Sequence, residues 1–307
     1  MFGGRILILI DNLRDGLNTF KALSSESRIR ILELLSEYHQ LNMNELAEKL
    51  GLTNGAITSH VKKLEECGLI KVSTESAARG NQKLCYLHED KLIFDLKKKT
   101  EEKFYESEIA VGHFSDYDVY PTCGLANKDH IIGEVDDPSF FADPERINSQ
   151  ILWFTKGFIE YRLPNYLKPG QELSEIQISM EISSEAPGVC NDWPSDIFFY
   201  LNDVELGSWT SPGDFGETKG IFTPSWWYPN WNQYGLLKLL SVSKYGTFID
   251  GSKISEVTID QLKLDHKSNY KFKIAVPEKA ENKGGLTIFG DNFGNYNQNI
   301  YVRLIYN

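Results

Sequence analysis

A short segment of the chain, residues 53–66, places polar and basic side chains at the spacing of one helix face. Ile57, Val61 and Leu64 recur at intervals of four and three residues, which predicts a buried stripe. Small polar residues and one lysine are left on the other face: Asn54, Gly55, Thr58, Ser59 and Lys62. Side chains of this kind can bind base edges and phosphates in a major groove of DNA. We therefore take Asn54, Thr58, Ser59 and Lys62 as candidate DNA contacts.

The elements that position this face are a helix from Met43 to Leu50, a turn at Gly51 and Leu52, and a second helix that opens at Thr53. A glycine allows the sharp crossing of two helices, and a threonine can cap the second helix by accepting its early backbone N–H bonds. The spacing predicts a helix-turn-helix.

A basic hairpin follows the second helix. Gly68 is a plausible helix stop, and two strands are expected at 70–74 and 84–88 around a tip at residues 76–81. Arg79 and Lys83 would make that tip a phosphate or minor-groove contact. The whole arrangement is typical of a winged helix-turn-helix.

Three motifs in this region resemble the ArsR-type winged-helix repressors: FKALSSESRIRIL at 20–32, NELAEKLGL at 44–52 and TSHVKKL at 58–64. The resemblance covers roughly a third of the chain and implies a DNA-binding transcriptional regulator. A winged helix used only for protein contacts is the alternative reading.

Many members of that family sense metals, but the ligands of two common sites are missing here. The helix at 43–50 has no cysteine, and residues 90–108 contain no histidine. Cys67 and Cys85 are isolated, as small apolar core residues often are. Zinc requires about four converging donors. We therefore expect no metal and no cofactor.

After the hairpin, residues 90–109 predict a long amphipathic helix with a solvated charge run at 97–102. By position, the resemblance implies that this helix forms a homodimer interface. Two recognition helices related by a two-fold axis would read an inverted-repeat operator on double-stranded DNA. A ligand could then act by changing the dimer geometry through this helix.

Length and charge divide the chain further. Its 307 residues exceed the need of one winged helix, and no stretch approaches the about 20 apolar residues of a membrane span. Residues 1–110 hold 16 basic and 17 acidic side chains, whereas 111–307 hold 16 basic and 26 acidic ones, so most of the net charge of −11 belongs to the second part.

Two features bear on cellular location. Four scattered cysteines suggest no disulfide framework, and Ile6 to Ile10 makes a poor signal peptide, so we expect a cytoplasmic protein.

The second part, residues 111–307, alternates short β-rich runs with turn residues. Residues 176–182 and 270–276 alternate strictly between apolar and polar, and 201–204 and 249–252 contain plausible hairpin turns. About ten strands without a long helix predict an antiparallel β-sandwich of jelly-roll type. The expected fold is therefore two-domain α+β.

The loops of this sandwich are rich in aromatic, amide and acidic residues. Flat rings beside carboxylates and amides suit a carbohydrate, because sugar C–H faces stack on rings while hydroxyls hydrogen-bond to planar polar groups. The candidate ligand-binding residues are Asp192, Trp193, Trp226, Trp227, Trp231, Asp291 and Asn292. The alternative is that the tryptophans plug the ends of the sandwich.

Together these features predict a transcriptional regulator, a repressor by resemblance, whose β-sandwich senses a small polar effector such as a sugar. A protein-docking or oligomerisation module is the second interpretation. A carbohydrate-active enzyme ranks last, because the sequence has no nucleophile elbow, no His-Glu-x-x-His pair and no phosphate-binding glycine loop.

Overall fold

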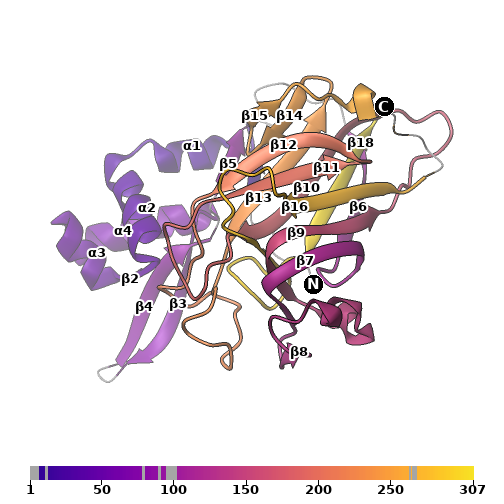
Figure 1. Cartoon of the computed structure of the whole chain (residues 1–307). Coiled ribbons are helices and arrows are strands. Elements are labelled where there is room, and N and C mark those ends of the chain that lie inside the picture. The colour runs from indigo at the N-terminus through magenta and orange to yellow at the C-terminus, as the bar shows by residue number, and fades with distance from the viewer. Residues whose placement is uncertain are drawn as a thin grey trace. The chain divides into compact units, whose positions relative to one another are not determined.

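The computed structural model describes residues 7–10, 13–77, 80–88, 91–94, 102–262, 264 and 268–307. The chain separates into two compact units, with the boundary between Glu101 and Glu102 (Figure 1). This boundary lies earlier than the one expected at residue 110. The N-terminal unit carries the helices, and the C-terminal unit is an antiparallel β domain, as the sequence predicts.

The N-terminal unit is a winged helix-turn-helix. Its helices are α1 (Leu17–Leu23), α2 (Glu26–Tyr38), α3 (Met43–Leu50) and α4 (Asn54–Glu66). One antiparallel sheet has the strand order β2-β4-β3, formed by β2 (Gln40–Asn42), β3 (Ile70–Ala77) and β4 (Gly80–Leu87). A separate parallel pair consists of β1 (Leu7–Ile10) and β5 (Lys91–Phe94).

Local hydrogen bonds define where α3 and α4 begin and end. Asn42 and Glu45 form a capping box at the start of α3. Gly51 ends that helix with a left-handed φ of 63°, a conformation that favours glycine. Thr53 Oγ1 then accepts a 3.2 Å bond from Ala56 N at the start of α4. The predicted helix-turn-helix is confirmed.

The stripe predicted on α4 is buried. Ile57, Val61 and Leu64 are at most 2% exposed, and they share a core with Ile31 of α2 and Leu46 of α3. Burial of one face by two other helices fixes the rotation of α4 about its axis. The opposite face is thereby held toward solvent.

The helix expected over residues 90–109 is wrong for the described part of that range. β5 pairs with β1, and β6 (Lys103–Ile109) pairs with β18 (Ile300–Tyr306) along its whole length. Tyr105 and Ile109 lie on the less exposed side of β6, at the even spacing that a strand requires. A complete partner strand thus overrides a weak helical pattern. The helical dimer interface expected in this range is therefore also wrong for the described residues. The same holds for the expected transmission of ligand binding through that helix.

The β domain forms one continuous sheet among its described residues, and it bends into two layers. Besides β6 and β18, its strands are β7 (Phe114–Ala126), β8 (Ile131–Ile132), β9 (Ile151–Leu163), β10 (Leu173–Ser183), β11 (Ser195–Leu201), β12 (Val204–Ser211), β13 (Leu236–Ser243), β14 (Gly246–Ile249), β15 (Ser252–Ser255), β16 (Tyr270–Val276) and β17 (Leu286–Phe289). Three short 3-10 helices complete it: η1 (Pro138–Ala142), η2 (Pro144–Asn148) and η3 (Ile259–Leu262).

The first layer has the strand order β12-β11-β16-β9-β7, and the second contains β6, β18, β10, β13, β14 and β15. β17 joins them, because it pairs with β9 on one side and β10 on the other. At the far edge, Ser255 Oγ of β15 donates a 2.6 Å bond to the Leu206 carbonyl of β12. The result is a jelly-roll sandwich that nearly closes into a barrel (Figure 1).

Both predicted hairpin turns are confirmed. Asn202 and Asp203 join β11 to β12 with φ values of 47° and 65°, and Asp250 and Gly251 join β14 to β15 with 52° and 82°. These positive values are typical of two-residue hairpin turns that follow the twist of the strands.

The β-rich run at residues 257–262 does not form a strand. Most of it is η3, and Gln261 Oε1 accepts a 2.9 Å bond from Thr258 N. This local side-chain bond stabilises a turn in place of a strand. None of the helices in the described parts of the chain has the length and apolar character needed to cross a membrane.

Candidate nucleic-acid interface and ligand-binding surfaces

The outward face of α4 carries the predicted polar residues, and all of them are exposed: Asn54, Gly55, Thr58, Ser59 and Lys62. Asn54 Nδ2 donates a 3.0 Å bond to Asn44 Oδ1 of α3, and Thr58 Oγ1 donates a 2.8 Å bond to the Asn54 carbonyl. The Lys62 ammonium lies 3.8 Å from Glu66, and its side chain is 74% exposed. The face therefore presents amide, hydroxyl and ammonium groups on a fixed helix.

His60 lies at the inner margin of this face. Among the described residues, its Nδ1 atom is buried without a hydrogen-bond partner. Burial, and then the charges of Arg28 and Lys63, lower the pKa of His60 below its ordinary value. The ring is therefore neutral near neutral pH, and it contributes packing to α4 and no positive charge.

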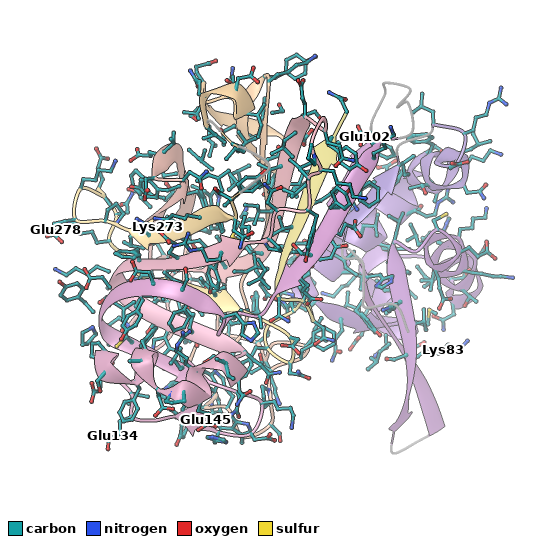
Figure 2. All side chains as sticks on the ribbon, turned by 90° about the vertical axis from the view of Figure 1, so that its right-hand side faces the viewer. Lys83, Glu102, Glu134, Glu145, Lys273 and Glu278 are labelled. Atoms are coloured by element: carbon teal, nitrogen blue, oxygen red, sulfur yellow. The ribbon has the colours of Figure 1, made fainter. Side chains whose placement is uncertain are left out.

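The wing is the β3–β4 hairpin. Lys83 lies opposite Thr74 in the antiparallel register and is exposed on the hairpin (Figure 2). Arg79, the second predicted wing contact, lies outside the described residues. One exposed basic wing side chain thus belongs to the same unit as the α4 face.

Three of the seven predicted sugar-binding residues come together in an aromatic cluster. Trp227 packs edge-to-face against Trp226 and Trp231 at centroid distances of 5.4 and 5.1 Å, and against Trp153 of β9 at 5.7 Å. Trp227 is only 4% exposed, and its indole N–H donates to the Asn232 carbonyl at 2.9 Å. Most of this cluster is packing surface, as the alternative interpretation of the loops expects.

The other four predicted residues lie in two different loops. Asp192 and Trp193 are exposed, and the Trp193 indole donates a 3.1 Å bond to the Glu185 carbonyl. Asp291 and Asn292 form a turn before β18, in which Asn292 Nδ2 donates to Asp291 at 3.2 Å. The described residues show no ring contact between Trp193 and the tryptophan cluster.

A pair of buried carboxyl groups lies close to these loops. Glu185 accepts bonds from Thr122, Asn232 and Thr287 at 3.1 to 3.2 Å. Asp214 accepts one bond, from Ala186 N at 2.9 Å, and its other oxygen has no hydrogen-bond partner among the described residues.

Both of these acids are fully or almost fully buried. Burial raises the pKa of Asp214 to about 7, and burial together with the Asp214 charge raises the pKa of Glu185 well above its ordinary value. The buried site therefore favours the neutral form of Glu185.

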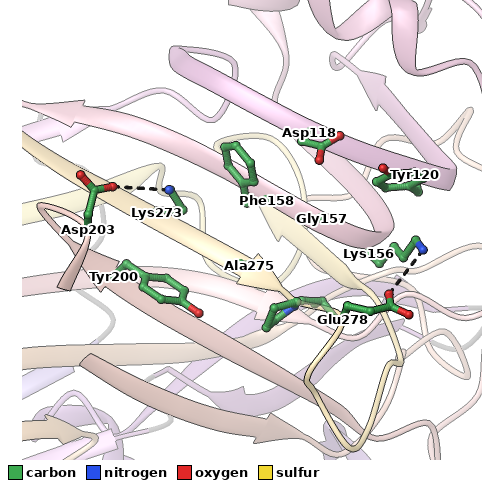
Figure 3. A pocket seen from close by; sticks show the side chains of 12 residues that line it. Asp118, Tyr120, Lys156, Gly157, Phe158, Tyr200, Asp203, Lys273, Ala275 and Glu278 are labelled. Carbon is green, nitrogen blue, oxygen red and sulfur yellow. Dashed lines mark hydrogen bonds and ion pairs between the residues drawn. The ribbon is translucent and has the colours of Figure 1, made fainter. Parts of the chain in front are cut away.

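A groove of about 680 Å³ runs over the outer face of the first layer, and we call it the sheet-face groove. It is lined from four strands and the segment after β16: Asp118 and Tyr120 of β7, Lys156, Gly157 and Phe158 of β9, Tyr200 of β11 with Asp203 beyond it, and Lys273, Ala275, Val276, Pro277 and Glu278. Figure 3 shows an ion pair on either side of Tyr200, Lys273 with Asp203 and Lys156 with Glu278. The N–O distances are 3.6 and 3.4 Å.

This groove was not predicted from the sequence. The strand at 270–276, which contains Lys273, was predicted, and its alternation was a signal that Lys273 points away from the core. Phe158, Tyr200 and Lys273 lie on one surface because β16 pairs with both β9 and β11, although β16 is far from both of them in the sequence.

Comparison with known proteins bears on each unit separately. Residues 24–71 match the family model described as winged helix-turn-helix DNA-binding. An uncharacterized protein of Methanocaldococcus jannaschii is 41% identical over 63 residues, which span 20% of this chain and 67% of that protein.

Two solved structures are also similar. A transcriptional regulator homologue from Pyrococcus horikoshii OT3 is 23% identical with a TM-score of 0.19, and covers 23% of this chain and 74% of its own. The CBM36-1 domain of a multidomain xylanase from the hindgut metagenome of Trinervitermes trinervoides is 8% identical with a TM-score of 0.29. The match covers 65% of this chain and 96% of that domain's chain. Through its N-terminal part, the chain belongs to the winged helix-turn-helix DNA-binding family.

Proposed function

We propose that this chain is a DNA-binding transcriptional regulator, a repressor by resemblance, whose β domain senses a small polar ligand, most simply a carbohydrate. The observation that carries the proposal is the exposed polar face of α4, with Asn54, Thr58, Ser59 and Lys62 on a capped and well-packed helix.

The α4 side chains have separate roles in the proposed complex. The Asn54 amide is suited to the paired donor and acceptor edge of adenine, and the hydroxyls of Thr58 and Ser59 can bond to base or phosphate oxygens. Lys62 contributes a phosphate contact. Lys83 on the wing, together with Arg79, adds phosphate or minor-groove contacts, and these bonds weaken as salt rises.

We also propose that the protein binds its operator as a homodimer on an inverted repeat. Support comes from charge: the second part of the chain is strongly acidic, so the basic surface available to DNA is small. Two linked copies gain affinity that one small patch lacks. With no helix at 103–109, this dimer interface has to lie on other surfaces.

The ligand-sensing role is supported by exposed aromatic side chains of the β domain, such as Trp193 and Tyr228, and we assign it no catalytic step. A tenfold change in operator affinity requires about 1.4 kcal/mol of differential ligand binding between two states. A protein-docking module is the second candidate, favoured by the burial of Trp227 within the tryptophan cluster. In that case the tryptophan loops would stabilise the β domain, and its ligand would be a macromolecule and not a sugar.

The test uses an operator selected from random duplexes by the full-length protein. Lys62→Ala should weaken binding at every sequence and reduce the salt slope by about 0.9, the contribution of one phosphate contact. Lys219→Ala in the β domain makes the same charge change at an exposed site and should leave both quantities unaltered. An unchanged slope for Lys62→Ala, or failure to select any duplex, would remove the DNA-binding assignment.

A further inference from the structure

We propose that the sheet-face groove is the binding site for a neutral oligosaccharide. This proposal rests on the proposed function, in that the β domain must sense a polar ligand, and it moves the site away from the tryptophan loops. The groove volume of about 680 Å³ lies within the roughly 300–1,000 Å³ range of small-molecule sites.

The floor of the groove is open because small residues lie among large ones. Ala275 of β16 lies directly opposite Phe158 of β9 and Phe198 of β11 in the strand registers. A methyl group between two phenyl rings leaves a hollow on the sheet. Gly157, beside Phe158, adds no side chain to it. The floor is therefore shallow and partly apolar, and the ammonium groups of Lys273 and Lys279 lie 4.7 Å from the centroids of the Phe158 and Phe198 rings. A sugar ring can place its C–H face on the hollow and accept hydrogen bonds from these ammonium groups.

Aromatic side chains extend across the groove. Tyr200 of β11 and Tyr120 of β7 are separated by three strand spacings, about 14 Å across the sheet, and by four residues, about 13 Å, along the strands. That span exceeds one sugar ring and matches a short chain of rings. Burial, and then the charge of Glu205, raise the pKa of Tyr200 to about 12, so the phenol stays neutral.

The charges select for a neutral ligand. Lys156 pairs with Glu278, and Lys273 pairs with Asp203 and lies 3.9 Å from Glu160. With Asp118 added, carboxylates outnumber ammonium groups in the lining. An anionic ligand would be repelled by this excess, whereas sugar hydroxyls can donate to the carboxylates and accept from the lysines.

The experiment measures binding of xylotriose, cellotriose and maltotriose to the full-length protein by titration calorimetry. At least one should bind, and trigalacturonic acid, which carries a carboxylate on every ring, should bind more weakly.

The variants test which residues form the site. Tyr200→Ala should lower the affinity at least about tenfold, while Tyr200→Phe, which keeps the ring, should retain most of the affinity. Ala275→Leu fills the hollow and should also abolish binding. Tyr245→Ala, at a 61% exposed aromatic in the turn after β13, is the control and should bind normally.

Two results would overturn the proposal in distinguishable ways. If a trisaccharide binds, and Trp193→Ala abolishes that binding while folded Tyr200→Ala and Ala275→Leu do not, the sugar-sensing function stands and the groove assignment is wrong. If none of the three binds the wild-type protein, the groove proposal and the sugar part of the proposed function both fail. Operator binding by the same preparation then shows whether the DNA-binding part survives.

Discussion

The side-chain amide of Asn54 donates a 3.0 Å hydrogen bond to Asn44 Oδ1, and this bond joins the first turn of α4 to α3. Asn54 is therefore oriented before DNA arrives, and Asn44 is a positioning residue for the candidate recognition face.

Replacing Asn44 with alanine should reduce operator affinity about fivefold, equivalent to the roughly 1 kcal/mol of one neutral hydrogen bond, with an unchanged salt slope. The slope stays because the phosphate contacts remain. Fluorescence anisotropy at several salt concentrations measures both quantities. Glu48→Ala is the control variant. It changes an exposed side chain of the same helix and removes a negative charge, but it leaves the bond between Asn44 and Asn54 in place. Normal affinity in Asn44→Ala would show that Asn54 is not pre-oriented by this bond.

The buried Asp214 predicts a loss of β-domain stability at higher pH. Its folded pKa of about 7 lies above the ordinary value for an aspartate, so the stability of the neutral form is present below the unfolded pKa and is lost as pH rises through 7. From about pH 5 to about pH 8 the loss due to Asp214 should be on the order of 2 to 3 kcal/mol.

Urea denaturation followed by tryptophan fluorescence tests this prediction. Asp214→Asn, which cannot ionise, should make the pH profile shallower, and the slope that remains belongs to Glu185, whose pKa is also raised. Asp260→Asn, at an exposed site, should leave the profile unchanged. An equally steep profile in Asp214→Asn would mean that another group causes it.

Trp227 should matter more for stability than Trp193. Trp227→Ala removes the centre of the tryptophan cluster and should cost about 3–5 kcal/mol of unfolding free energy. Trp193 is 38% exposed, and its replacement by alanine should cost about 1 kcal/mol. The same urea titration compares them. Equal, small costs would show that the cluster is not needed for the fold and would return it to consideration as a binding surface.

Gly157 should tolerate no side chain. Its φ is 114°, and an added Cβ would overlap the Asp118 carbonyl oxygen of the adjacent strand. Gly251 has a similarly positive φ of 82° but open space around it, so Gly251→Ala should cost only the backbone term of about 1–2 kcal/mol. Gly157→Ala should cost at least about 3 kcal/mol or prevent folding. Thermal denaturation of both variants separates crowding from backbone strain, and equal melting temperatures would contradict the close approach of β7 and β9.

Local patterns in the sequence were sufficient wherever neighbours along the chain determine the structure. The Thr53 cap, the Gly51 turn and the stripe of Ile57, Val61 and Leu64 all depend on residues within a few positions, and all are confirmed. The strand at 270–276 and the turn at Asn202 and Asp203 were predicted for the same reason. These features place the chain in the winged helix-turn-helix family and predict the β-sandwich.

Tertiary structure decided what long-range pairing controls. Residues 103–109 form a strand because β18, almost two hundred residues later, offers a complete register of partners. Trp227 is buried because three other tryptophans, one of them on β9, surround it. The sheet-face groove exists because β16 brings Ala275 between Phe158 and Phe198. Sequence periodicity reports which face of a segment is apolar, but it carries no information about which distant segment covers that face, and the candidate binding surface depends on that second fact.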